Sequence, residues 1–247
     1  MSAGPKRPIL AVLHQEHSTP GRVGQRLRAR GYGLDVRRPR FGDPLPETLA
    51  GHAGAIVFGG PMSANDADDY LKREADWIGV PLKEEAPFLG LCLGAQLMAL
   101  HLGAPVRPHA DGHIEVGWFG LTPTEAGRRL TTWPDKVHQF HREGFDLPHG
   151  ASLLAEGAAE TFPNQAFAYG RASFAIQFHI ELTLAMVNRW TGRIGERARL
   201  PGGQAPESHF EGRALHDWKT VAFLDAFLDL WLSRDARAGS DFAAAAE

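Results

Sequence analysis

The sequence predicts an α/β fold in which an open, mostly parallel sheet with a mixed edge carries helices on both faces. Short apolar runs alternate with helical periodicity through the first hundred residues, a pattern typical of successive β-α units. Beyond residue 103, glycines and prolines separate short strand-like pieces, which indicates a different, hairpin-rich part of the sheet. A chain of 247 residues is also long enough to bury a sizeable core.

The first half of the chain supplies the parallel strands and their helices. Val23 and Leu27 share one face of the first expected helix, and Leu71, Ala75 and Ile78 follow helical spacing in the second. Apolar runs between these helices read as buried strands. The expected strands are residues 9–13, 33–37, 53–58 and 88–91, and the expected helices are 21–30, 69–80 and 93–102.

The second half predicts short strands at residues 114–121, 166–169 and 174–179, the last two joined by a turn at Gly170-Arg171. A helix over 182–190 and a mobile connection over 192–208 follow. A last helix carries an apolar stripe that must pack in cis or against another subunit, and the sequence leaves that choice open. We expect a domain over 1–190 and a C-terminal linker and helix over 191–247. The stripe consists of Trp218, Val221, Leu224, Leu228 and Trp231.

Composition narrows the classes of function. The net charge of −3 and 22% charged residues provide no basic field for a phosphate backbone, so nucleic acid is not an expected partner. A single cysteine excludes an intrachain disulfide and fits a reducing compartment. No run approaches the roughly 20 apolar residues of a membrane span. These features predict a cytoplasmic protein with no membrane partner.

The only cysteine, Cys92, stands in the sequence GLCLG of residues 90–94, between a strand and a helix. A nucleophile at such a sharp bend needs small neighbours two positions away, and the helix N-terminus favours a thiolate. The alternative is a buried cysteine that packs as a small apolar side chain. The pentapeptide by itself does not separate the two.

A general base for such a thiol is available in the sequence QFHIE of residues 177–181. In an extended strand His179 and Glu181 would leave the same face, so the carboxylate could orient one imidazole nitrogen while the other faces the sulfur. The alternative is a half-buried histidine beside a solvent-facing glutamate.

Together, GLCLGAQ at 90–96, FGGP at 58–61 and QFHIE at 177–181 resemble the class I, triad-type glutamine amidotransferases. The likeness covers about residues 8–190 and is greatest to stand-alone proteins similar to the glutaminase domain of GMP synthetase. It implies a flavodoxin-like fold and a Cys-His-Glu triad of Cys92, His179 and Glu181. The resemblance further implies oxyanion-hole N–H groups at Gly60 and Leu93, and substrate contacts from Gly59, Gln96 and His141.

Two departures from the family pattern bear on activity. Ile180 replaces the proline between the histidine and the glutamate; it should keep the chain extended and preserve their pairing. Arg142, Glu143 and Gly144 replace Gly-Asp-Thr after His141, which places a cation and an anion at the expected rim of the site.

The resemblance implies hydrolysis of the γ-amide of glutamine through a cysteine thioester, with release of ammonia. Alternatives are hydrolysis of a γ-glutamyl peptide or conjugate by the same triad, and a catalytically silent regulatory subunit. The ammonia would pass to a separate synthetase subunit or simply be released. We expect no cofactor and no metal, because neither His109 with His113 nor His138 with His141 lies on a predicted helix that would direct both rings to one point. A homo-oligomer is compatible with the unpaired last helix.

Overall fold

A computed structural model describes residues 6–235 of the chain, so the expected frayed tail after Asp235 lies outside the described residues. Its main sheet has eight strands in the order β2-β1-β3-β4-β12-β11-β10-β7. The five strands from β2 to β12 pair in parallel, and β11, β10 and β7 extend one edge in antiparallel fashion. The bounds are β1 Ile9–Val12, β2 Leu34–Arg37, β3 Gly54–Val57, β4 Phe88–Leu91, β7 Thr122–Pro123, β10 Ser152–Glu156, β11 Asn164–Tyr169 and β12 Ser173–Ile176.

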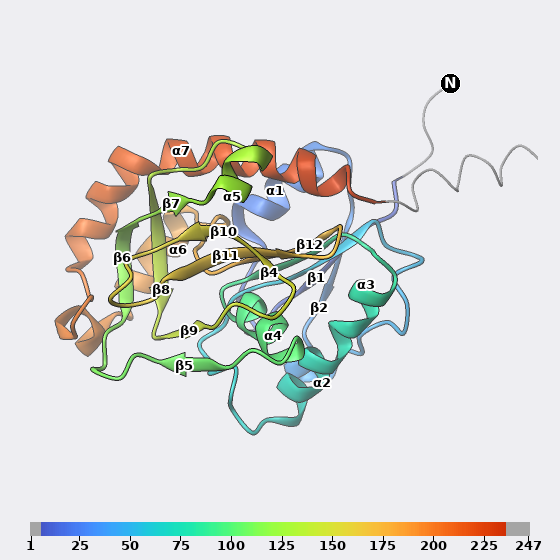
Figure 1. Cartoon of the computed structure of the whole chain (residues 1–247), viewed down its shortest axis with the longest axis horizontal. Coiled ribbons are helices and arrows are strands. Elements are labelled where there is room, and N and C mark those ends of the chain that lie inside the picture. Colours follow the sequence, from blue (N-terminus) through green and yellow to red (C-terminus); the bar gives the residue numbers. More distant parts are fainter. Residues whose placement is uncertain (1–5, 236–247) are drawn as a thin grey trace, which may run out of the picture.

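Helices cover both faces of this sheet (Figure 1). Helices α1, α5 and α7 lie on one side of it, and α2, α3 and α4 on the other. Each face has its own apolar cluster, because parallel strands are buried on both sides. The bounds are α1 Gly21–Ala29, α2 Asp69–Trp77, α3 Gly79–Lys83, α4 Leu93–His101, α5 Glu125–Leu130, α6 Leu184–Thr191 and α7 Pro206–Leu232.

Two small antiparallel sheets lie beside the main one. Strand β5, Val106–Pro108, pairs with β9, Glu143–Phe145, and β6, Glu115–Gly120, pairs with β8, Lys136–His141. The fold class predicted from the sequence, including its mixed edge, is therefore confirmed.

Two predicted elements end earlier than expected. The helix expected over 69–80 is interrupted at Ile78, so α2 and α3 are separate helices. The strand expected over 174–179 ends at Ile176, which places His179 and Glu181 in the turn beyond it. The backbone leaves the sheet there because the N–H of His179 donates to the carbonyl oxygen of His138, at 3.0 Å, instead of continuing the β4 ladder.

The last helix packs in cis over one face of the sheet. Phe227 stacks on Phe223 and meets Phe174 of β12 edge-on, and Trp231 is fully buried. Trp218 was wrongly placed on the apolar stripe, because its side chain is 65% exposed. Helix α7 also packs on β6 and β8. Asp217 and Thr220, on either side of Trp218, are buried, so Trp218 lies on the opposite, exposed face of the helix.

The segment expected as a mobile connection is folded. It contains the short 3-10 helix η2, Gly195–Arg199, and hydrogen-bonds to the start of β6 through the carbonyl oxygens of Pro201 and Gly202. This contact fixes the segment against β6. A domain boundary at residue 190 stays a prediction. Among the described residues, no helix combines the length and apolarity needed to cross a membrane.

Candidate active site

Cys92 occupies the sharp turn between β4 and α4. Its φ of 50° and ψ of −105° lie outside the regions that most side chains adopt, so the backbone is strained here. A Cβ on Gly90 would come within 2.5 Å of the carbonyl oxygen of Gly94, and one on Gly94 would overlap the carbonyl oxygen of Val57. The small residues predicted on either side of the cysteine are therefore sterically required.

His179 and Glu181 form a buried pair in the turn after β12. The Nδ1–H of His179 donates to Oε1 of Glu181 at 2.7 Å, so Nδ1 carries a proton. Ile180, between them, is fully buried in the apolar cluster on the other side, so replacing the family's proline leaves the pairing intact.

The second ring nitrogen of His179 is turned toward the cysteine. Within residues 6–235, Nε2 makes no fully formed hydrogen bond. The Cys92 sulfur is nevertheless close enough to raise the pKa of the imidazole. Burial by itself lowers the pKa of His179. The Glu181 carboxylate, followed by the neighbouring Cys92 sulfur, outweighs burial and raises this pKa to about 10. The imidazole is therefore protonated at neutral pH.

Gly59 and Gly60 follow β3, directly beside the cysteine turn. A Cβ on Gly59 would stand 3.2 Å from Cε1 of His179 and 3.8 Å from Sγ of Cys92, so the glycine lies against both groups. A Cβ on Gly60 would lie 3.0 Å from Cδ2 of Leu93. The two residues predicted to supply oxyanion N–H groups are thus neighbours in space.

Gln96 and His141 are held by internal hydrogen bonds at this cavity. Nε2 of Gln96 donates to the backbone oxygen of Glu143 at 2.8 Å. His141 contacts the same backbone oxygen through Nδ1 and Oε2 of Glu115 through Nε2, both at 3.0 Å. The structure thus places both side chains at the cavity wall but engages the polar groups expected to contact substrate.

The two charged residues expected at the rim, Arg142 and Glu143, both line the cavity. Arg142 is exposed, whereas Glu143 is buried and its Oε1 accepts a hydrogen bond from the Ser63 hydroxyl at 2.8 Å. Glu143 thereby also ties β9 to the loop after β3.

Most of the predicted site residues border one cavity of about 300 Å³. Its wall includes Cys92, His179, Glu181, Gly59, Gly60, Gln96 and His141. Leu93 is adjacent through its contact with Gly60.

Sequence reasoning missed the basic side of this cavity. Arg142 is joined there by Arg189 at the end of α6 and by Arg193 and Arg197 in the following segment. Within residues 6–235, none of the four has a salt bridge to a carboxylate. Nothing in the local sequence shows that 189–197 returns to the site, because the bonds that hold the following residues, Pro201 and Gly202, to the start of β6 are tertiary contacts.

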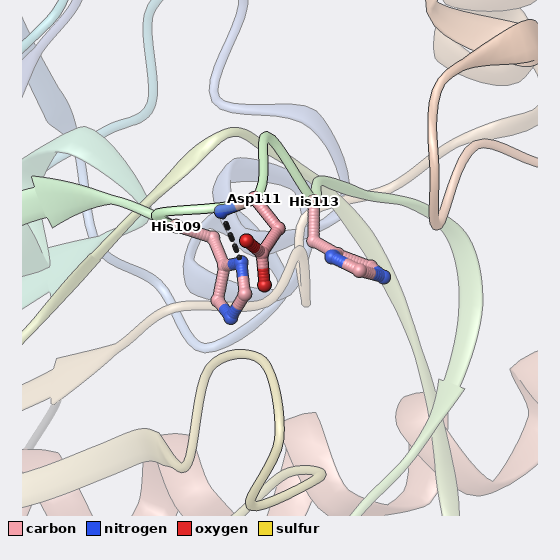
Figure 2. Close-up of side chains that lie close together, drawn as sticks. All are labelled: His109, Asp111 and His113. Carbon is pink, nitrogen blue, oxygen red and sulfur yellow. Dashed lines mark hydrogen bonds between the residues drawn. The ribbon is translucent and has the colours of Figure 1, made fainter.

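Three polar side chains outside the cavity lie close together after β5, as Figure 2 shows. Ligand atoms of His109, Asp111 and His113 are within 4.8 Å of one another. However, Nδ1 of His109 accepts the Asp111 N–H at 3.1 Å, and its Nε2 must donate to the Glu160 carbonyl oxygen at 2.9 Å. Both His109 nitrogens are engaged, so this cluster is poorly suited to a metal.

The other histidine pair considered from the sequence does not converge. His138 bonds to His209 of α7 at 3.0 Å, whereas His141 bonds to Glu115. An expectation of no metal stays a prediction.

An elbow cysteine beside a His-Glu pair, at the C-terminal edge of a mostly parallel sheet, is the arrangement of α/β proteins with a nucleophile elbow. Residues 15–187 match the sequence profile of the family described as glutamine amidotransferase class-I. The chain therefore belongs to the class I glutamine amidotransferase family.

Sequence relatives include a Salmonella typhimurium protein described as glutamine amidotransferase-like, YfeJ. It is 29% identical over 186 residues, which are 71% of this chain and 76% of that protein. The glutamine-hydrolyzing GMP synthase of Campylobacter lari is 34% identical over 167 residues, 65% of this chain. The match spans only 30% of that synthase.

Solved structures resemble nearly the whole chain. A glutamine amidotransferase from Thermotoga maritima superposes with a TM-score of 0.81 and 28% identity, covering 93% of this chain and 99% of that one. One from Methylobacillus flagellatus gives a TM-score of 0.80 at 26% identity, covering 93% and 94% respectively.

Proposed function

We propose that the protein hydrolyses the γ-amide of glutamine through a thioester on Cys92 and releases ammonia. The observation that supports this most directly is the position of Cys92, at a strained turn and beside the His179–Glu181 pair, in the wall of one cavity. Family membership supports glutamine amide chemistry in general.

The reaction begins when the Cys92 thiolate attacks the amide carbon, and the carbonyl π electrons move to oxygen. The N–H groups of Gly60 and Leu93 stabilise that oxyanion; one such donor is worth about 3–4 kcal/mol in comparable sites. His179, already protonated, donates its Nε2 proton to the departing nitrogen as the C–N bond breaks.

The second half of the reaction consumes water. Neutral His179 removes a proton from water as its oxygen attacks the thioester carbon, and collapse of the second tetrahedral intermediate expels the thiolate. Glutamate leaves, and Cys92 and the imidazolium are restored. Glu181 holds the ring through Nδ1 and does not itself take a proton.

Cys92→Ala tests this proposal. We expect loss of ammonia release by at least about 10³-fold with an unchanged fold, because the covalent route is removed. Mass spectrometry of the wild-type protein with a glutamine-analogue electrophile should show one adduct on Cys92. Ammonia release by the Cys92→Ala variant at the wild-type rate would overturn the mechanism. Absence of both turnover and adduct in the wild type would favour the silent regulatory subunit.

The arginine side of the cavity favours a second candidate substrate, a γ-glutamyl compound with an additional carboxylate on its amine part. Arg189 and Arg193 also line an adjoining cavity of about 390 Å³, which has room beyond a free glutamine. Guanidinium groups bind carboxylates in bidentate fashion.

Comparing glutamine, γ-glutamyl-glutamate and γ-glutamyl-alanine amide decides between the two. Under the second candidate, Arg193→Ala raises KM for γ-glutamyl-glutamate about tenfold and leaves KM for glutamine unchanged. Equal effects on all three substrates would remove the support for it. Transfer of ammonia to a separate synthetase subunit is compatible with either substrate and is part of the proposal, suggested by the GMP synthases among the relatives.

A further inference from the structure

Another buried His-Glu pair lies across the glycine loop, residues 59–60, from Cys92. His14 follows β1, and Glu74 lies on α2; Nε2 of His14 is 2.7 Å from Oε2 of Glu74. Both side chains are fully buried, with 0% exposure. The mechanism proposed above uses neither residue.

The other nitrogen of His14 contacts the glycine loop itself. Nδ1 lies 3.2 Å from the carbonyl oxygen of Gly59. A carbonyl oxygen only accepts, so Nδ1 carries a proton and donates it. Nε2 and the Glu74 carboxyl then share a second proton, and the pair as a whole fixes both the tautomer and the ring orientation of His14.

This contact determines where the next N–H points. No described peptide bond is cis, so within the Gly59–Gly60 peptide the C=O and the N–H point in opposite directions. With the Gly59 carbonyl held by His14, the N–H of Gly60 is directed away from His14.

The sheet register shows what lies on that opposite side. Val12 of β1 pairs with Val57 of β3, and Val57 pairs with Gly90 of β4. His14, Gly59 and Cys92 each lie two residues beyond these paired positions, just after the ends of β1, β3 and β4. The glycine loop is thus flanked by His14 on the β1 side and by the nucleophile on the β4 side, and a Cβ on Gly60 would lie 3.0 Å from Cδ2 of Leu93 and 3.1 Å from Cβ of His14.

From this arrangement we infer that His14 and Glu74 are positioning residues, which hold the Gly59–Gly60 peptide so that the Gly60 N–H faces the oxyanion. The inference rests on the proposed function and extends it to two residues that do not touch substrate. Burying an ionic His-Glu pair costs several kcal/mol of desolvation per ion, which the attraction between the two groups must offset. Apolar residues of similar volume often stabilise such a buried site equally well. A role in orienting the Gly59–Gly60 peptide explains why the His14–Glu74 pair is buried next to the Gly59 carbonyl oxygen.

The test removes the pair without leaving an unpaired buried charge. In His14→Leu/Glu74→Leu the space is filled by apolar side chains, so the fold should be retained. We expect kcat for glutamine to fall about 10²-fold or more with KM changed less than threefold, the effect of losing one oxyanion donor. In His14→Gln/Glu74→Gln an amide can still donate to Gly59, and kcat should stay within about tenfold of wild type.

Alkylation of Cys92 by iodoacetamide provides the contrasting readout, because that displacement forms no oxyanion. Its rate in the Leu/Leu variant should remain within twofold of wild type. His52→Leu is the matched control: it removes a His-carboxylate contact, with Asp35 at 3.0 Å on β2, and should leave kcat unchanged.

Two results would overturn the inference: a kcat of the Leu/Leu variant within threefold of wild type, or a parallel loss of alkylation and turnover. Crystal structures of the wild type and the Leu/Leu variant test the same point without substrate. The Gly59 carbonyl should rotate in the variant, and an unmoved Gly59–Gly60 peptide would contradict the positioning role of His14 and Glu74. Inactivity of the wild-type enzyme would count against the proposed function, whereas an unmoved peptide counts against this inference.

Discussion

Glu181→Gln removes the negative charge beside His179 and keeps the shape of the side chain. In the wild-type structure Oε1 of Glu181 accepts from Nδ1 at 2.7 Å, and both side chains are buried. Burial disfavours the charged ring, and the Glu181 carboxylate is the largest influence acting in the opposite direction, ahead of the Cys92 side chain. The variant therefore changes mainly the pKa of His179.

The expected size of the change follows from that pKa. A rise from 6.5 to about 10 represents about 5 kcal/mol of preference for the protonated ring, at about 1.4 kcal/mol per pKa unit. A single neighbouring opposite charge accounts for about 1–3 pKa units. We therefore expect the pKa of His179 in Glu181→Gln to lie between roughly 7 and 9.

This change has a signed consequence for activity. With a pKa near 10, His179 is about nine-tenths protonated at pH 9 and can serve as the acid toward ammonia; with a pKa near 8 only about one-tenth remains. Loss of turnover on raising the pH should thus begin about 1–3 pH units lower in the variant than in the wild type.

Titration of ¹³C-labelled histidine by NMR measures the pKa directly. The chain has 12 histidines, so the His179 signal is assigned by its absence in His179→Gln. Asp35→Asn, which removes a carboxylate beside His52 away from the cavity, is the control and should leave the His179 titration in place. A His179 pKa that is the same in Glu181→Gln and in the wild type would refute the electrostatic reasoning.

Two further predictions concern the framework of the site. Gly94→Ala forces a Cβ into the carbonyl oxygen of Val57 and should lower the free energy of unfolding in urea by about 1–3 kcal/mol or more. Gly51→Ala is the control and should not lower it, because nothing lies within 4 Å of the new Cβ. Equal stability of the two variants would contradict the steric argument. Phe227→Ala removes a ring packed on Phe223 and Phe174 and should cost about 3–5 kcal/mol in the same measurement. Trp218→Ala, at a 65% exposed position, should stay within about 0.5 kcal/mol of wild type, and a larger loss there would indicate a contact made by that side chain.

Local sequence patterns were sufficient for most of the main sheet. Strand β4 and the start of α4 have the predicted bounds because an apolar run, two glycines and a run of helix formers are all local signals. The same signals place Cys92 at the turn. They could not show that His179 and Glu181 lie beyond the strand end, because the bond from the His179 N–H to His138 joins residues distant in the chain.

The chain order of apolar and small residues thus specified the α/β class, the parallel strands and the cysteine turn, since each depends on the conformation of a few consecutive residues. Tertiary packing decided which distant groups surround that turn. Sheet register placed His14 and Gly59 in one row with Cys92, and the folded 192–208 segment brought Arg193 and Arg197 to the cavity. Such contacts form only when separate elements pack together, and they are stabilised by surface buried between residues far apart in the chain. A short stretch of sequence therefore does not reveal them.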